Sequence, residues 1–301
     1  MKLYRVGKVK KVFEVDDETF EFQFTNNISV FDKIIPTEIP YKGEVLCRTS
    51  AFWFKLLAEH GIRSDFIKLS GKDRMLVKRV DVIPDYSKLN HKTINYLIPL
   101  ELICRHYNAG SLNDRVKEGK IKVEQLGFPK GHQLKYGEKL PQDFFEATTK
   151  LEETDRNLDK EEALRISGLT ENEYQEVIST IAKIDALIGE RAAKAGLIHV
   201  DGKKEFAYDE KRRLMIVDTF GTLDEDRWWD AAEYEKGNCL ELSKEMVRQH
   251  YRETGYHEAL YKARKEHRPE PDIPALPNDV VEKVSRLYIE MYERMTGERF
   301  F

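Results

Sequence analysis

The stretch LIHVDGKKEFAYDEKRRLMIVDTF, residues 197–220, decides how the second half of the chain folds. Two runs rich in apolar residues, 197–208 and 214–220, flank the polar segment 209–213. Extended runs on either side of a short polar turn are typical of a β-hairpin, whose two strands pair in antiparallel fashion. The stretch therefore predicts antiparallel sheet in this half of the chain.

Charged residues gather on this predicted hairpin. With the turn centred near Lys211, Glu205 lies opposite Val217 or Asp218, so that two carboxylates from neighbouring strands meet near one point. Lys203 shares the face of Glu205, because side chains two apart on a strand point the same way. Paired carboxylates suit a Mg²⁺ ion, which prefers oxygen ligands. On the pattern alone, an exposed hairpin with ordinary salt bridges is the more common arrangement.

Outside the hairpin, strands and helices form separate groups. A capping box, Thr170 with Glu173, marks the start of one helix, because each side chain can satisfy a free backbone N–H. The segment 119–139 predicts a loop or short strand, after which the chain is predicted to become helical. The other predicted strands are 9–15, 20–24, 73–82 and 94–105, and the predicted helices are 44–60, 171–196 and 278–296. This grouping predicts an α+β fold rather than a doubly wound sheet.

The composition limits the classes of function. A length of 301 residues suggests two lobes of about 150 residues each, or one large domain with an elaborated half. The 50 basic and 54 acidic residues nearly cancel, which argues against a general nucleic-acid binder. No apolar run approaches the roughly 18 residues that cross a bilayer, the N-terminus lacks signal-peptide character, and the three distant cysteines form no CxxC motif. We therefore expect a cytoplasmic protein without nucleic-acid or membrane partners.

Further segments carry candidate binding residues. In GKVKKVFEV, residues 7–15, a glycine precedes alternating lysines, which can neutralise phosphates but which fit a solvated edge strand better. Arg105 is followed by a small-residue turn with Ser111, a combination that binds carboxylates or phosphates or simply caps a helix. Asp224 and Arg227 lie beside two tryptophans, either as a ligand clamp or as a surface ion pair.

Taken in order along the chain, these segments resemble the SAICAR synthetase family in its long form. The resemblance runs from residue 7 to residue 297. Besides GKVKKVFEV and the late hairpin, it includes NISVFD (27–32), IPYKGEVLCRTSAFWF (39–54), IPLELICRHYNAGS (98–111), TTKLEETDR (148–156), DEDRWW (224–229) and LPNDVVEKVSRLYIEMYERMTG (276–297). No single motif is decisive, but so many in one order are hard to obtain by chance.

The resemblance implies an ATP-dependent ligase of de novo purine biosynthesis. Such an enzyme joins L-aspartate to the carboxylate of CAIR through an acyl phosphate and gives SAICAR, ADP and phosphate. The implied cofactor is Mg²⁺, with ATP as co-substrate, and a homo-oligomer stays open. The implied α+β fold has two lobes built on antiparallel sheets with flanking helices and an ATP cleft between them. Residues 1–100 would form the lobe that covers ATP, and residues 101–301 the lobe that carries the metal and CAIR sites.

Residue roles follow only where this chain matches the family motifs. The resemblance assigns catalysis to Lys203, Glu205 and Asp218, and makes Glu205 and Asp218 the metal ligands. It assigns ATP binding to Gly7, Lys8, Lys10 and the hinge backbone from Leu97 to Glu101. It assigns CAIR binding to Arg105, Ser111, Asp224 and Arg227. It places Ser29, Asp32, Thr149 and Lys150 near aspartate and the acyl phosphate.

Three motifs depart from the common family pattern. The pattern DRISAFD stands here as NNISVFD, residues 26–32, and loses a charged pair. The pattern DTKFEFG stands here as DGKKEFA, residues 201–207, and keeps its three polar anchors. The pattern DExxTPDSSR stands here as DTFGTLDEDR, residues 218–227, in which acids replace both serines. Acids near an anionic substrate would repel it, so we expect Glu225 and Asp226 to point to solvent or to pair with C-terminal basic residues such as Lys244.

Three alternative functions stay open on the sequence. The chain could be a paralogous ligase that acts on another carboxylate. It could also be a small-molecule kinase, which would use the same Mg-ATP site but would need no aspartate. A non-catalytic nucleotide sensor is disfavoured, because a protein that only binds nucleotide has no need of Glu205 and Asp218 together.

Overall fold

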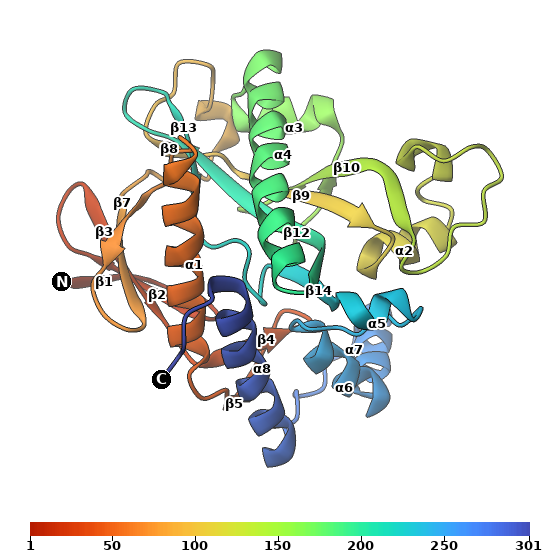
Figure 1. The fold of residues 1–301 in the computed structure, drawn as a ribbon. Coiled ribbons are helices and arrows are strands. Elements are labelled where there is room, and N and C mark those ends of the chain that lie inside the picture. The colour runs from red at the N-terminus through yellow and green to blue at the C-terminus, as the bar shows by residue number, and fades with distance from the viewer.

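The computed structural model describes residues 1–301 and contains three antiparallel sheets with eight α-helices around them. Figure 1 shows the N-terminal sheet at one side of the molecule, the largest sheet across its upper half and the C-terminal helices below. Strands and helices are grouped along the chain rather than alternating, so the predicted α+β class is confirmed.

The N-terminal segment forms a five-stranded sheet and a separate two-stranded ribbon. In spatial order the five strands are β1 (Lys2–Val6), β2 (Lys10–Glu14), β3 (Thr19–Phe24), β7 (Arg74–Lys78) and β6 (Phe66–Leu69). The ribbon consists of β4 (Asn27–Val30) and β5 (Lys33–Glu38). Strands β2 and β3 pair as predicted, and the exposed strand β1 adds an edge that the alternation pattern does not reveal.

The larger sheet is built around one long strand. Its seven strands are β8 (Tyr96–Leu97), β9 (Leu100–Tyr107), β10 (Lys139–Thr149), β11 (Asn157–Leu158), β12 (Leu197–Tyr208), β13 (Leu214–Val217) and, beside β12, β14 (Asp226–Asp230). Strand β12 pairs with four of them: β8, β9, β13 and β14. Any residue on β12 is therefore held by neighbours from distant parts of the chain.

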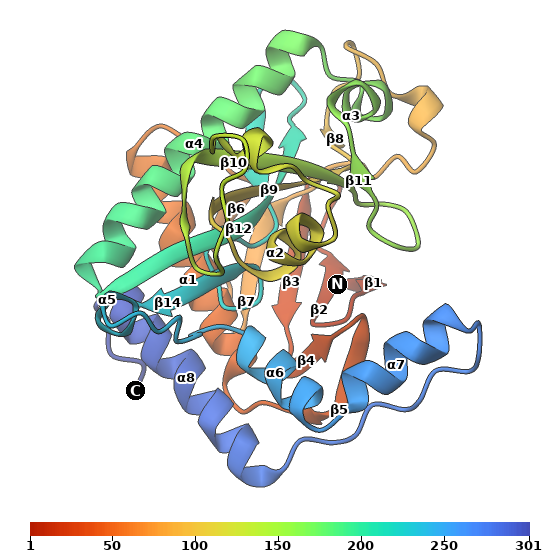
Figure 2. The ribbon, with the colours of Figure 1, turned by 90° about the vertical axis from the view of Figure 1, so that its right-hand side faces the viewer.

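Helices cover these sheets and join them. They are α1 (Lys42–Glu59), α2 (Gly110–Lys117), α3 (Lys160–Ser167), α4 (Glu171–Lys194), α5 (Ala231–Glu235), α6 (Glu245–Glu253), α7 (Tyr256–Lys265) and α8 (Asn278–Thr296), with short 3₁₀ turns at Tyr86–Lys88 and Val123–Leu126. Helix α4 packs along β12, whereas α1 contacts β3 and β7 on one side and α8 on another (Figure 2). No helix combines the length and the apolar character that a membrane span needs.

One continuous apolar core connects the two sheets. It includes Phe20 on β3, Trp53 on α1, Ile184 on α4 and Tyr288 on α8, all of them buried. Each large apolar side chain removed from water in this way contributes about 1.5–3 kcal/mol to the free energy of unfolding. The core therefore fixes how the N-terminal sheet faces the larger one, and with it the geometry between them.

The structure confirms the central predictions from local sequence. Glu205 pairs with Val217, which is one of the two registers that the turn position allowed. The capping box at the start of α4 is complete: Glu173 N–H donates to Thr170 Oγ1 at 3.3 Å, and Thr170 N–H donates to Glu173 Oε2 at 2.8 Å. The predicted helices at 44–60 and 278–296 correspond to α1 and α8.

Other predictions from local sequence are wrong. The segment after 139 is not helical at first, because β10 forms there by pairing with β9; its interior Pro141 and a register shift hide the strand pattern. The strand predicted for 94–105 is broken near Pro99 into β8 and β9. The DEDRWW motif contributes β14, since its backbone pairs with β12. Each error concerns a strand whose partner is distant in the sequence.

We expect Thr170→Ala to lower the free energy of unfolding by about 1 kcal/mol, because the substitution leaves a backbone N–H of the first turn of α4 without its acceptor. Urea unfolding of the wild type and the variant would measure the difference. Ser179→Ala is the matched control, because Ser179 is exposed in the interior of the same helix and its hydroxyl only donates to the Glu176 carbonyl. Equal losses in both variants would contradict the capping role.

Candidate active site

Four charged side chains form a compact cluster on one face of the larger sheet. Lys203 Nζ lies 2.9 Å from Glu101 Oε1 and 3.9 Å from Glu205 Oε1. Lys150 Nζ lies 2.5 Å from Glu205 Oε2 and 3.7 Å from Glu101 Oε1. Glu101 lies on β9, Lys150 directly follows β10, and Lys203 and Glu205 lie within β12, so that cross-strand pairing brings them together. Lys150, Lys203 and Glu205 are thus neighbours, whereas Thr149 beside them is buried and its hydroxyl accepts the backbone N–H of Arg156.

A residue of the N-terminal sheet reaches into the same region. Lys10 Nζ on β2 lies 2.5 Å from Asp218 Oδ1, just after β13. Asp218 has a φ of 62°, a left-handed conformation that is uncommon for a residue other than glycine. Strained backbone of this kind concentrates at functional sites. The pair joins the two sheets at the edge of the Glu205 cluster.

Two acids that sequence reasoning did not assign belong to this region, one of them half-buried and the other buried. Glu225 Oε2 lies 3.4 Å from Lys203 Nζ. Asp65, which precedes β6, is buried beside Asp218, and its Oδ1 has no hydrogen-bond partner. Glu225 lies in the DEDRWW motif, but the pattern gave no sign that it would face Lys203, and Asp65 lies in no motif, because the place of each segment in the fold depends on tertiary contacts. The expectation that Glu225 faces solvent or pairs with Lys244 is wrong, because β12 presents Lys203 to it.

Burial and mutual repulsion control the ionisation of these acids. Burial raises the pKa of Glu205, of Glu225 and of Asp65, and the charge of Asp218 adds to each rise. Burial opposes ionisation of Asp218 too, but Lys10 and Lys150 outweigh it and hold the pKa of Asp218 below its usual range. The carboxyl groups of the region are Asp65, Glu101, Glu205, Asp218 and Glu225, and its lysines are Lys10, Lys150 and Lys203. If all were ionised, two negative charges would be in excess, which is the charge that one divalent cation neutralises.

A second group, centred on Asp201, lies farther along β9 and β12. Arg105 and Arg227 flank Asp201 across the sheet, and their guanidinium groups lie 3.2 and 2.7 Å from Asp201 Oδ2. Arg105 also donates to Ser111 Oγ at 3.1 Å. Gly110 permits this packing, because a Cβ there would lie 2.6 Å from the Arg227 guanidinium nitrogens. Three of the four predicted CAIR-binding residues are therefore neighbours.

The fourth, Asp224, lies in a separate buried ion cluster. Lys42 Nζ on α1 lies 2.8 Å from Asp224 Oδ2, and the Tyr288 hydroxyl on α8 donates to Asp224 Oδ1 at 2.5 Å. Lys244 Nζ is 3.6 Å from the same carboxylate and donates no hydrogen bond to it. Burial, together with the charges of Lys42 and Arg248, lowers the pKa of Lys244 to about 8 in spite of Asp224.

The other predicted residues lie around the N-terminal sheet and the hinge. Lys8 Nζ contacts Asp32 Oδ1 at 2.7 Å, which connects the turn after β1 to the β4–β5 ribbon. Ser29 lies on that ribbon opposite Ile34. Gly7 N–H donates to the Lys10 carbonyl at 2.8 Å within the β1–β2 turn, and Leu97 N–H donates to the Asp81 carbonyl at 2.9 Å.

Asp226 is not near solvent, contrary to expectation, but lies in a buried network on the opposite side of β12. Its Oδ2 lies 2.7 Å from His199 Nε2 and 3.6 Å from Lys204 Nζ. Lys204 is fully buried and also pairs with Asp185 of α4. The pairing of Asp226 with Lys244 that the sequence suggested is therefore wrong.

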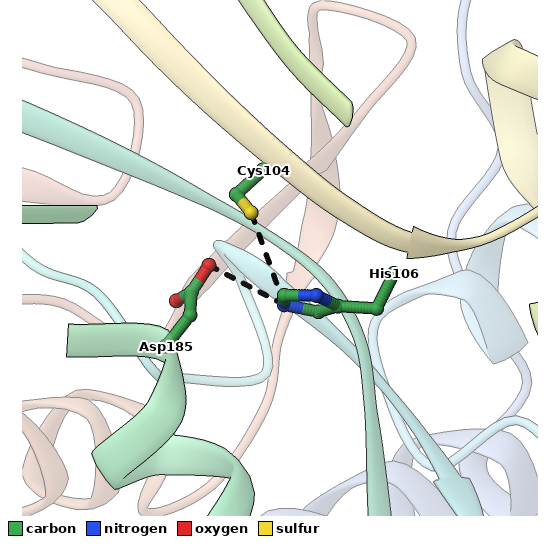
Figure 3. A group of neighbouring side chains, drawn as sticks. All are labelled: Cys104, His106 and Asp185. Atoms are coloured by element: carbon green, nitrogen blue, oxygen red, sulfur yellow. Dashed lines mark hydrogen bonds and ion pairs between the residues drawn. The ribbon is translucent and has the colours of Figure 1, made fainter. Parts of the chain in front are cut away.

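Asp185 also belongs to a group with metal-ligand chemistry, shown in Figure 3: Cys104 and His106 of β9 point toward Asp185 of α4. His106 Nε2 lies 4.0 Å from Cys104 Sγ and 3.4 Å from Asp185 Oδ2. Burial would lower the pKa of His106, but hydrogen bonds to Asp143 and Asp185 outweigh it and raise the pKa to about 12. A protonated imidazole is no metal ligand, and burial raises the pKa of the Cys104 thiol as well. We therefore interpret this group as part of the ion network.

Comparison with known proteins identifies the family. The family model of SAICAR synthetase matches residues 2–263. The phosphoribosylaminoimidazole-succinocarboxamide synthase of Thermoplasma acidophilum is 55% identical over 300 residues, which cover 100% of both chains. The chain belongs to the SAICAR synthetase family. The predicted family and the predicted class of activity, an ATP-dependent ligase of purine biosynthesis, are thereby confirmed.

More distant members of the family agree. The synthase of Saccharomyces cerevisiae is 31% identical over 98% of this chain and 94% of its own. Its structure, described as complexed with SAICAR, matches with a TM-score of 0.76 and 27% identity, covering 99% of this chain and 95% of the yeast chain. A type-2 SAICAR synthetase in complex with ADP matches with a TM-score of 0.70 and 26% identity, covering 99% of each chain.

We expect Lys244→Met to raise the free energy of unfolding at pH 7 by about 1–3 kcal/mol, because it removes a buried ammonium without a hydrogen-bonded partner. The folded lysine loses its proton near pH 8, whereas the unfolded lysine keeps it to about 10.5. The destabilisation by Lys244 is thus full below pH 8 and fades as the pH rises toward 10.5. Urea unfolding at pH 7 and pH 9.5 would measure this.

Lys262→Met, at an exposed position of α7, is the matched control for the change in net charge. We expect little change in its free energy of unfolding at either pH. A Lys244→Met variant that is less stable than the wild type at pH 7 would contradict the predicted destabilisation.

Proposed function

We propose that the chain joins L-aspartate to CAIR at the Glu205 cluster, using ATP, and that the residues predicted from the family motifs act there. The observation that carries the residue-level proposal is the meeting of Lys10 from the N-terminal sheet with Asp218, beside Glu205, Lys150 and Lys203. Lysines and acids from two sheets at one point suit the binding of a polyphosphate with a divalent cation between them.

The two lobes, residues 1–100 and 101–301, would divide the work. In this proposal the N-terminal lobe covers ATP, with Gly7 and Lys8 in the β1–β2 turn above the phosphates and Lys10 beside Asp218. The backbone from Leu97 to Glu101 connects the lobes and borders the adenine. The single apolar core that joins the sheets supports this arrangement, since it holds the two halves in a fixed relation.

The donor set fits a magnesium ion. Glu205 and Asp218 offer carboxylate oxygens, which are hard ligands, and the excess of buried acid around them is what a divalent cation would relieve. Bound Mg²⁺ would stabilise negative charge on the phosphate oxygens. Lys203 and Lys150, held by Glu101 and Glu205, would contribute fixed positive charge to the same end.

The arginine group would receive the other substrate. Arg105, Ser111 and Arg227 offer guanidinium and hydroxyl donors next to the catalytic face, and Arg side chains bind phosphate and carboxylate through paired hydrogen bonds. We assign Asp224 to the same substrate through its place in the loop before β14. Ser29, Asp32, Thr149 and Lys150 would lie near the aspartate and the acyl phosphate.

The chemistry requires positioning more than covalent catalysis. A carboxylate is a poor electrophile, because an amine cannot displace oxide from it. Transfer of the γ-phosphoryl group to the CAIR carboxylate forms an acyl phosphate and releases ADP. The aspartate amine then attacks the acyl carbon, the C–O bond to phosphate breaks, and phosphate leaves. The lysines and arginines of this chain would hold the anionic partners in line and neutralise their charge.

A component-omission assay tests the function. Release of ADP is followed with Mg-ATP, CAIR and L-aspartate, each left out in turn, and the product is identified by mass. Steady turnover that needs all three, with the mass of SAICAR, is the expected result. Turnover without aspartate would instead indicate a kinase, and ATP binding without CAIR-dependent turnover would indicate a ligase for another carboxylate.

We expect Glu205→Gln and Asp218→Asn each to lower kcat about 100-fold or more, because each removes a carboxylate from the proposed metal site. Steady-state kinetics would show the loss, and circular dichroism would show that the fold is kept. Glu210→Gln, an exposed change in the turn of the same hairpin, is the matched control and should keep full activity. Near-normal turnover of either site variant would remove that residue from the proposed metal site.

We expect Arg105→Lys to raise the KM for CAIR about tenfold and to change the KM for ATP less than about twofold. Lysine keeps a positive charge beside the buried Glu146 carboxylate. Its ammonium group lacks the paired N–H donors of the guanidinium group. Arg165→Lys, at an exposed ion pair on α3, is the control. If the two KM values rise together, Arg105 does not have the assigned role.

A further inference from the structure

Asp226, the first residue of β14, is fully buried and binds three partners. Its Oδ1 accepts the backbone N–H of Gly221 at 2.9 Å. Its Oδ2 lies 2.7 Å from His199 Nε2 and 3.6 Å from Lys204 Nζ. The contact with His199 is short enough for a hydrogen bond. Asp226 thus joins the loop before β14 to the buried side of β12.

The loop that Asp226 holds, residues 218–225, carries Asp218, Asp224 and Glu225 between β13 and β14. Gly221 in this loop is fixed from the other side as well, since Trp53 Nε1 on α1 donates to the Gly221 carbonyl at 2.9 Å. Gly221 has a φ of +66°, and a Cβ there would lie 2.5 Å from Trp53 Nε1. Both backbone groups of this residue are therefore held by buried side chains.

Lys204, the cation beside Asp226, is held by a second ion pair. Lys204 is fully buried, and its second carboxylate partner is Asp185 on α4. Gly202 leaves the space for this ion group, because a Cβ there would lie 2.1 Å from Asp226 Oδ2 and 2.7 Å from Lys204 Nζ. An acid at 226 thus requires both a cation at 204 and a glycine at 202.

Gly202, Lys204 and Asp226 form one contact group in the structure. Residues that meet at one buried point act as a unit, because a change at one of them alone would leave a clash or an unpaired charge.

We propose that Asp226, held by Lys204 and His199, is a positioning residue for the ligase reaction. Asp226 touches no substrate and acts through Gly221, whose backbone it fixes, to set the loop that carries Asp218, Asp224 and Glu225 against the catalytic face of β12. The inference rests on the proposed function. The alternative is that this buried ion pair only stabilises the fold. The two hypotheses differ in whether a variant that still folds loses activity.

The experiment compares variants that break different parts of the group. Asp226→Ala removes the acceptor for Gly221, whereas Asp226→Asn keeps an oxygen that can accept that N–H. Asp185→Asn is the matched control, because it removes the other partner of Lys204 and does not contact the loop. Thermal unfolding gives the Tm of each variant. The values of kcat are then measured well below every Tm, with circular dichroism to confirm folding.

We expect Asp226→Ala to lower kcat about tenfold or more, and Asp226→Asn to lower it no more than about threefold. We expect Asp185→Asn to lower Tm while kcat stays within about twofold of the wild type. The inference is overturned if folded Asp226→Ala keeps wild-type kcat, or if Asp185→Asn lowers kcat as much as Asp226→Ala. If Asp226→Ala does not fold, the double variant with Lys204→Met and Asp226→Ala replaces it. The double variant also lacks the buried ammonium group.

Hydrogen–deuterium exchange separates this inference from the proposed function. Exchange reports local opening of the backbone and does not depend on which substrate the enzyme uses. We expect faster exchange of peptides that cover 218–226 in Asp226→Ala and unchanged exchange there in Asp185→Asn. Failure of the wild type to use CAIR would overturn the proposed function alone, whereas unchanged exchange of the loop in Asp226→Ala would overturn the positioning role.

Discussion

The pairing of β12 with four other strands is the constraint on which the rest of the structure depends. Backbone hydrogen bonds to β8, β9, β13 and β14 fix the direction of every side chain along it. One face of this strand then presents Lys203 and Glu205 to the proposed active site. The other face buries Lys204 against α4. A single strand therefore carries charges of the proposed active site and, one residue away, the buried ion group of Lys204.

The pKa shifts in this site arise because more acidic than basic side chains lie close together and partly away from solvent. The free protein stabilises some of these acids with lysines, as Lys10 does for Asp218, and leaves others with a raised pKa, as in Glu205 and Glu225. Such an arrangement is poor for folding but suited to a site that receives cations and phosphates, because the bound partners complete the charge balance. Lys244, with its lowered pKa, is a second example of charge kept at the expense of stability.

The acidic positions 225 and 226 show how a departure from a family pattern can be absorbed. Adjacent residues leave the chain in opposite directions, so Glu225 joins the catalytic face and Asp226 the buried network. Neither faces the solvent or pairs with Lys244, as the sequence suggested. Glu225 pairs with Lys203, whereas Asp226 fits beside Gly202 and pairs with Lys204.

The sequence by itself determined the features that depend on near neighbours. These include the hairpin, with Glu205 opposite Val217 or its neighbour Asp218, the capping box of α4 and the helices α1 and α8. The motif order also determined the family. Only the tertiary structure decided the partner of Asp226, the burial of Asp65 and the strand character of β10 and β14. The physical reason is that these features depend on contacts between segments far apart in the chain. A local pattern of residues contains no information about such contacts.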